Sequence, residues 1–103
     1  MSRETEDSMG DSRTRAVVTG MGAITPLGQS VDKYWSSLVR GESGIGQITL
    51  ADTTGFPSSI AGEVTDFDPT DYVAPKEARR MARFSQLAVA SAALAIEDAG
   101  LDM

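Results

Sequence analysis

Four basic side chains are the group in this sequence best placed to do defined chemistry. Their spacing is i, i+3, i+4 and i+7, which puts them on one face of a helix: Lys76, Arg79, Arg80 and Arg83. Glu77 is the only acidic residue among them, although the chain as a whole has 15 acidic and 9 basic residues and a net charge of −6. A concentrated positive patch attracts and orients an acidic partner. The spacing alone leaves two interpretations open, a docking surface for an acidic protein or a solvated helix face.

The residue types that many enzymes use near pH 7 are absent. The sequence has no Cys and no His, which excludes thiolate nucleophiles, thiolate metal sites, disulfides and imidazole acid–base catalysis within it. The serine pairs Ser36-Ser37 and Ser58-Ser59 have no His that could activate them. Chemistry by these 103 residues alone would have to use carboxylates, Lys, Arg, hydroxyls or backbone amides.

A glycine-rich segment invites comparison with dinucleotide-binding turns. That fingerprint, Gly-x-Gly-x-x-Gly, opens directly into a helix whose N-terminus binds the pyrophosphate. Here Gly20 and Gly22 supply two glycines, but Thr25 stands at the third position and Pro26 follows it. A small dinucleotide binder is therefore one hypothesis. The alternative is a structural turn in which the glycines allow positive φ or close packing.

Three aspartates, Asp66, Asp68 and Asp71, resemble a calcium loop only in part. Counted from Asp66, an EF-hand needs Gly at position six and Glu at position twelve. The sequence has Asp71 and Glu77 there, so the required Gly is missing. We predict that the aspartates form a turn and that the chain holds no metal.

Composition and patterning predict a globular chain behind a short polar leader. Apolar residues make up 41% and charged residues 23% of the sequence, as in folded domains. The acidic balance argues against nucleic acid as a partner, and no apolar run has the roughly 18 residues of a membrane helix. Residues 1–14 lack the apolar centre of a secretory signal. We expect a disordered leader over 1–14, a cytoplasmic location and no membrane partner.

Two helices are predicted from apolar spacing and terminal residues. The first covers 31–39, with Ser30 as its N-cap and Gly41 beyond its last turn. Its apolar face carries Trp35, which we expect to anchor the core. The second helix covers 76–99 and carries the basic residues.

The predicted strands are too few to close a sheet. A strand over 16–19 is apolar without alternation, which indicates that both its faces are covered. We expect a second, short strand over 60–64 at a sheet edge, and a long surface connection over 41–59. A lone strand makes no sheet, and an Ala-rich helix needs a surface to pack on. We therefore predict an incomplete α/β fold and poor stability for the isolated chain.

Several segments also carry a resemblance, and they occur in one order along the chain. They are RAVVTGMGAITPLG at 15–28, YW at 34–35, GESGI at 41–45, IAGEV at 60–64, DFDP at 66–69 and KEARRM at 76–81. Together they resemble the opening of the β-ketoacyl-acyl-carrier-protein synthases, the type II condensing enzymes of fatty acid elongation.

The resemblance implies a thiolase-like fold, five-layered α-β-α-β-α when complete and usually homodimeric. Residues 15–103 would be the first segment of its N-terminal domain. It implies a decarboxylative Claisen condensation, in which an acyl group passes from the phosphopantetheine of acyl carrier protein to an enzyme Cys. The carbanion from malonyl-carrier protein then attacks that thioester.

The same resemblance assigns roles to few residues of this chain. The family's Cys and two His lie beyond its last residue, so we expect no catalytic residue, no bound cofactor and no activity from the chain alone. Lys76, Arg79 and Arg80 match basic residues that contact the acidic carrier protein, and Arg83 joins them on helical geometry. Three hypotheses follow: part of a ketoacyl synthase, a non-catalytic carrier-protein docking module, or a small dinucleotide binder.

Overall fold

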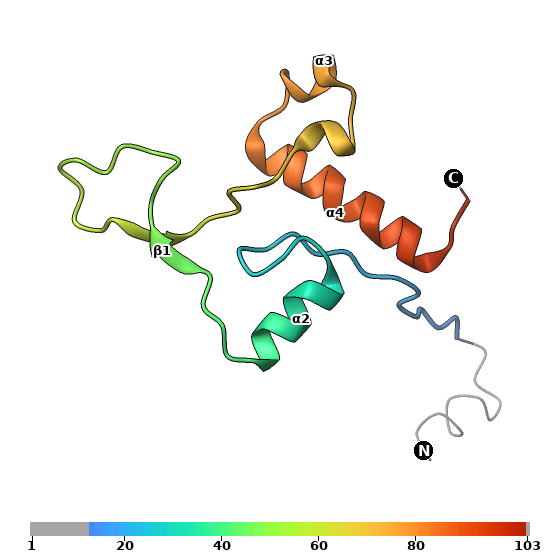
Figure 1. The fold of residues 1–103 in the computed structure, drawn as a ribbon. Coiled ribbons are helices and arrows are strands. Elements are labelled where there is room, and N and C mark those ends of the chain that lie inside the picture. The colour runs from blue at the N-terminus through green and yellow to red at the C-terminus, as the bar shows by residue number, and fades with distance from the viewer. Residues whose placement is uncertain (1–12, 103) are drawn as a thin grey trace.

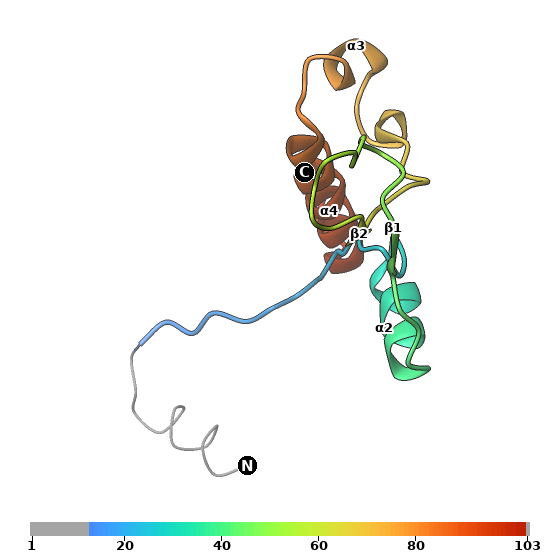
Figure 2. The same ribbon diagram turned by 90° about the vertical axis from the view of Figure 1, so that its left-hand side faces the viewer.

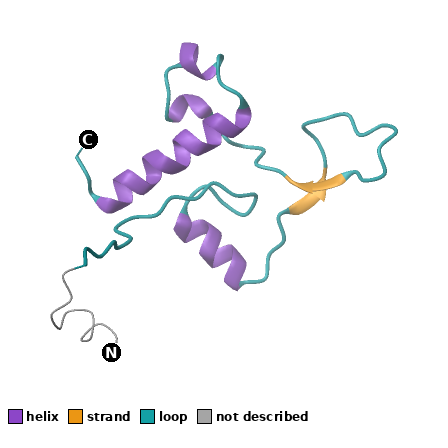
Figure 3. Cartoon of the chain, turned by 180° about the vertical axis from the view of Figure 1, so that it is seen from behind, coloured by secondary structure: helices purple, strands orange, loops and turns teal. Residues whose placement is uncertain are grey.

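The computed structural model describes residues 13–102, so the expected leader over 1–14 lies almost entirely outside the described residues. The elements follow one another as α2 (Val31–Val39), β1 (Ile45–Gln47), β2 (Ile60–Gly62), the 3-10 turn η1 (Pro69–Asp71), α3 (Pro75–Ala78) and α4 (Arg83–Ala99) (Figure 1). This is a mixed α/β segment with long connections, as Figure 3 shows.

Helix α2 forms where the sequence predicts it, because its signals are local. The Ser30 hydroxyl accepts a hydrogen bond from the Lys33 backbone N–H at 3.1 Å, the geometry of an N-cap. Gly41 follows the helix at φ +75°, which glycine adopts without strain. The expected core anchor is wrong, however: Trp35 is 61% exposed, because no element of the described chain covers that face.

The two strands form one short antiparallel hairpin. Ile45 pairs with Gly62 and Gln47 with Ile60, and the Ile48 N–H continues the ladder to the Ser59 carbonyl at 2.8 Å. The strand expected over 60–64 is confirmed over its first three residues. Its partner β1 lies inside the segment expected to be a surface connection. The hairpin stands apart from α4 in Figures 1 and 3.

The predicted strand over 16–19 does not form in the described residues. Val17 and Val18 are 79% and 80% exposed, and no strand lies beside them. In Figure 2 the blue segment that precedes α2 leads away from the helices at its N-terminal end. Without a neighbouring strand, extended backbone has no ladder to join.

The predicted single helix over 76–99 is two helices. α3 ends at Ala78, and Ala82 takes the extended conformation, with φ −68° and ψ 156°, before α4 begins. In the turn between them, the Arg80 N–H donates to the Glu77 carbonyl and the Met81 N–H to the Ala78 carbonyl. The α4 end is as predicted, with Gly100 left-handed at φ +70°.

Gly20 and Gly22 let the chain before α2 lie directly on α4. A Cβ on Gly20 would stand 2.5 Å from the Ala95 carbonyl oxygen, and one on Gly22 would stand 2.2 Å from that of Ser91. Neither glycine has positive φ. The close-packing interpretation of the glycines is therefore confirmed, and the positive-φ interpretation is wrong for these two.

The core of residues 13–102 is small. Its buried side chains are Phe67, Ala78 and Ala90, together with Ser37, whose hydroxyl donates to the Leu27 carbonyl at 3.3 Å. Within the same residues, no helix is long and apolar enough to cross a membrane.

Candidate functional site

Three of the four predicted basic residues lie together at one extremity of the molecule. Lys76 is in α3, and Arg79 and Arg80 are in the turn that follows; we call them the α3 cations. All three side chains are exposed, and none makes an ion pair with another described residue. Figures 1 and 2 show α3 at one end of the folded molecule, away from α2 and the hairpin.

Arg83 does not share a helix face with the α3 cations. The break between α3 and α4 changes the chain direction after Arg80, so the i, i+7 relation of one continuous helix is lost. The expected four-residue face is therefore wrong. The guanidinium of Arg83 instead donates from Nη2 to the Val64 carbonyl at 2.8 Å.

An aromatic pair lies beneath Arg83. Its Cζ stands 5.0 Å from the ring centroid of Phe67, within the range of a cation–π contact. Phe67 is only 7% exposed and stacks on Tyr72, with ring centroids 6.0 Å apart and planes 17° apart. The segment before α3 is thus packed against the first turn of α4.

The end of α3 is also attached to α4. Ala78 is 5% exposed, and its carbonyl accepts a hydrogen bond from Gln86 Nε2 at 2.9 Å. The same carbonyl also accepts from the Met81 N–H at 3.2 Å, so the end of α3 is held both by the turn that follows it and by α4. The α3 cations therefore project from a helix and a turn whose inner side is fixed by Ala78.

The aspartates before α3 form turns, as predicted. Asp68 caps η1: its Oδ1 accepts from the Thr70 hydroxyl at 2.6 Å and from the Thr70 N–H at 2.9 Å. These two bonds hold the pKa of Asp68 below its ordinary value. Asp66 accepts from Gln29 Nε2 at 2.8 Å. No cluster of acids that could hold a metal is found among residues 13–102.

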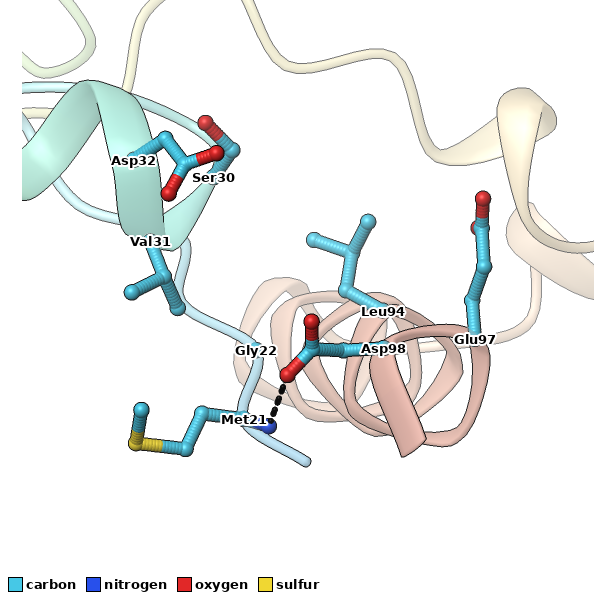
Figure 4. Close-up of a pocket in the computed structure, with 8 residues that line it drawn as sticks. All are labelled: Met21, Gly22, Ser30, Val31, Asp32, Leu94, Glu97 and Asp98. Carbon is cyan, nitrogen blue, oxygen red and sulfur yellow. Dashed lines mark hydrogen bonds between the residues drawn. The ribbon is translucent and has the colours of Figure 1, made fainter. Parts of the chain in front are cut away.

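A hollow between the glycine-rich segment, α2 and α4 is lined by carboxylates (Figure 4). Asp32 comes from α2, and Glu97 and Asp98 come from α4. The Met21 N–H, which a phosphate would need, donates to Asp98 Oδ2 at 2.9 Å. A pyrophosphate is negatively charged, so nearby carboxylates repel it, and the Met21 amide is already hydrogen-bonded to one of them. This geometry argues against the dinucleotide hypothesis.

Sequence reasoning found the α3 cations but missed what supports them. The Arg83–Val64 bond spans 19 residues and the Met21–Asp98 bond spans 77, and no local pattern reports such contacts. The one available signal was Phe67 between two aspartates, an aromatic residue in an otherwise polar turn.

Comparisons with known proteins agree with the resemblance. The 3-oxoacyl-[acyl-carrier-protein] synthase 2 of Vibrio harveyi is 44% identical over 92 residues, which are 89% of this chain and 22% of that protein. The protein of the same name from Synechocystis sp. is 47% identical over 89 residues, 86% of this chain and 21% of that one. The chain thus spans about a fifth of the length of these curated relatives.

A solved structure and a family model point the same way. The ishigamide ketosynthase/chain length factor is 41% identical, with a TM-score of 0.78 over 88% of this chain and 23% of that one. The family model described as "Beta-ketoacyl synthase, N-terminal domain" matches residues 13–103. With its fold, its ordered motifs and this match together, the chain belongs to the β-ketoacyl synthase family, as a segment of its N-terminal domain.

Proposed function

We propose that this chain supplies the N-terminal segment of a 3-oxoacyl-[acyl-carrier-protein] synthase, and that its α3 cations help to dock the acidic carrier protein. The observation that carries the proposal is the exposed cluster of Lys76, Arg79 and Arg80 at the tip of the fold. Three cations within five positions stand out in a chain with a net charge of −6.

The physical properties of the cluster suit transient docking. Exposed ion pairs contribute only about 0–1 kcal/mol each, and salt screens them. Three such contacts give a weak complex whose formation is steered by charge and whose partner can leave after each turnover. A carrier protein that delivers one substrate after another needs this kind of contact.

The condensation itself requires groups that this segment does not contain. The sequence has no Cys and no His, so the nucleophilic thiol and the two imidazoles would come from the remainder of the family's length. In the complete polypeptide we expect the five-layered thiolase-like fold, a homodimer and a cytoplasmic location. Its substrates would be acyl and malonyl groups carried on the phosphopantetheine of acyl carrier protein.

Charge reversal tests the docking surface. In the complete polypeptide, Arg79→Glu and Arg80→Glu should each weaken carrier-protein binding about tenfold at low ionic strength, with less effect at high salt. Fluorescence anisotropy of labelled carrier protein measures this. The matched control is Arg40→Glu, which reverses an exposed arginine that pairs with Glu42 beyond α2. Equal effects of Arg40→Glu and Arg79→Glu would refute local docking.

Sequencing the coding region past Met103 and weighing the native protein identify the polypeptide to assay. A frame that continues to a Cys and two His provides the complete protein for a condensation assay with malonyl-carrier protein. Absence of condensation by that protein would refute the enzymatic proposal. If gene and protein end at Met103, the absence of Cys and His favours the second candidate, a non-catalytic docking module, and carrier binding by the 103-residue chain tests it.

A further inference from the structure

We propose that Arg83 is a positioning residue: it holds the segment before α3 on α4 and so fixes where the α3 cations stand. It would not itself be a docking contact. The part of this inference that concerns the carrier protein rests on the proposed function. The part that concerns the attachment of the segment stands on the contacts of Arg83 alone.

The guanidinium of Arg83 makes two different contacts at once. Nη2 donates to the Val64 carbonyl at 2.8 Å, while Cζ lies 5.0 Å from the centre of the Phe67 ring. A planar guanidinium can donate in its plane and stack on a ring with its face, whereas an ammonium is attracted to a ring but has no plane to stack on it. Val64 and Phe67 are therefore attached to α4 by one side chain.

A second side chain of the same helix turn attaches the other end of the segment. Gln86, three positions after Arg83, donates from Nε2 to the Ala78 carbonyl at 2.9 Å. Residues i and i+3 lie on one helix face. Together Arg83 and Gln86 fix both ends of the segment 64–78, which contains η1 and α3.

The packing inside this segment transmits the attachment to α3. Phe67 stacks on Tyr72, and the Tyr72 and Val73 N–H groups both donate to the Pro69 carbonyl at 3.0 Å. α3 then begins at Pro75, only two residues after Val73. A docking surface fixed before the partner arrives loses less conformational entropy on binding. Releasing Arg83 should therefore weaken docking without removing a docking charge.

Amide hydrogen exchange on the complete polypeptide tests the attachment. Arg83→Gln should raise the exchange rates of the Tyr72 and Val73 amides about tenfold, which corresponds to about 1.4 kcal/mol. Arg40→Gln is the charge-matched control and should leave both rates unchanged. A change of less than about twofold in Arg83→Gln, or absence of protection at these amides in the parent chain, would overturn the attachment.

A double-mutant cycle with Phe67→Leu separates the specific contact from general loosening. If Arg83 acts through the ring, Arg83→Gln should add little once Phe67 is replaced, because the shared contact is already lost. Additive effects of the two substitutions would contradict the stacking contact. Equal acceleration of the α2 amides would show a global loss of stability instead, and would also overturn the proposal.

Carrier binding by the complete polypeptide distinguishes positioning from docking. Arg83→Lys keeps the charge but loses the fork, so positioning predicts that it weakens binding about as much as Arg83→Gln, roughly fivefold, with the parent's salt dependence. A docking role predicts parental affinity for Arg83→Lys and a shallower salt dependence for Arg83→Gln. If the Arg83 variants exchange the Tyr72 and Val73 amides faster but bind carrier protein with the parent's affinity, Arg83 has only a structural role. That result would overturn positioning.

The failure of each proposal is distinguishable. If the parent does not bind carrier protein at all, the proposed function fails, while the exchange rates at Tyr72 and Val73 still decide whether Arg83 holds the segment. If the parent binds and Arg79→Glu abolishes binding, but Arg83→Gln and Arg83→Lys change neither exchange nor affinity, the proposed function stands and the role of Arg83 is refuted.

Discussion

A methyl group at Gly22 should separate the glycine-rich segment from α4. The Cβ of Gly22→Ala would lie 2.2 Å from the Ser91 carbonyl oxygen and 2.8 Å from the Ala95 backbone nitrogen. Both atoms belong to the helix backbone, so no change of rotamer relieves the clash. The segment must therefore move outward by about an ångström to reach an ordinary contact.

The size of the effect follows from what that movement breaks. Overpacking of this kind costs about 1–3 kcal/mol. An outward shift also lengthens the 2.9 Å bond from the Met21 N–H to the Asp98 carboxylate beyond hydrogen-bond distance. Loss of that exposed bond adds about 1 kcal/mol. The expected total is about 2–4 kcal/mol, or at least a 30-fold loss of local protection.

The Met21 amide provides the assay, because it donates the bond that must break. The hydrogen exchange and the chemical shift of this amide are compared between the complete polypeptide and its Gly22→Ala variant. Gly46→Ala is the matched control, since a Cβ there meets no atom within 4 Å and Gly46 has no positive φ. Unchanged protection of Met21 in Gly22→Ala, or an equal loss in the control, would refute the packing argument.

Three further predictions concern α2, the loop beside β2 and the chain as a whole. Ser30→Ala removes the acceptor for the Lys33 N–H and should destabilise α2 by about 1 kcal/mol, seen as lower helicity in circular dichroism; unchanged helicity contradicts the cap. Backbone N–H groups of Leu50 and Thr49 hold the pKa of Glu63 below its usual 4.5, so its stabilising contribution is present above 4.5 and is lost as the pH falls through the lower folded value. An NMR titration of the Leu50 amide should show this acid transition in the parent and not in Glu63→Gln. The isolated 103-residue chain should melt without a cooperative transition, and a sharp calorimetric peak would contradict this.

The part of the fold predicted from sequence is the part that local signals determine. Ser30 caps α2 through a bond to a residue three positions away, and Gly41 ends the helix by its own backbone preference. Both effects lie within one or two helix turns, so the sequence pattern contains them. The same holds for Gly100 at the end of α4.

The break between α3 and α4 could not be predicted, because no helix breaker stands there. Residues 79–82 are Arg, Arg, Met and Ala, all compatible with a helix. The break coincides with distant contacts: Arg83 reaches back to Val64, and Gln86 reaches back to Ala78. Tertiary contacts override helix propensity here, and helical spacing consequently misplaced Arg83.

The candidate site was predicted in its residue types and only partly in its geometry. A cluster of positively charged residues can be recognised in the sequence, and Lys76, Arg79 and Arg80 do lie together in the structure. Strand β1 was missed for a related reason: three residues, Ile45–Gln47, are too few to show alternation, and their pairing depends on β2. Elements that exist only through a distant partner leave no local pattern.

The wrong prediction over 16–19 has a physical explanation that links the fold to the family. An unbroken apolar run is the pattern of a strand covered on both faces, yet Val17 and Val18 stand exposed beside no strand of the described chain. Trp35 on α2 and Phe84 on α4 are large, apolar and exposed as well. Covering such surfaces is favourable by about 25 cal/mol per Å². The relatives are between four and five times as long as the matched segment, so those proteins have further chain with which to cover such surfaces. The apolar run at 16–19 fits a family domain in which more chain is present. We propose that Val17, Trp35 and Phe84 mark the surfaces on which that further chain packs.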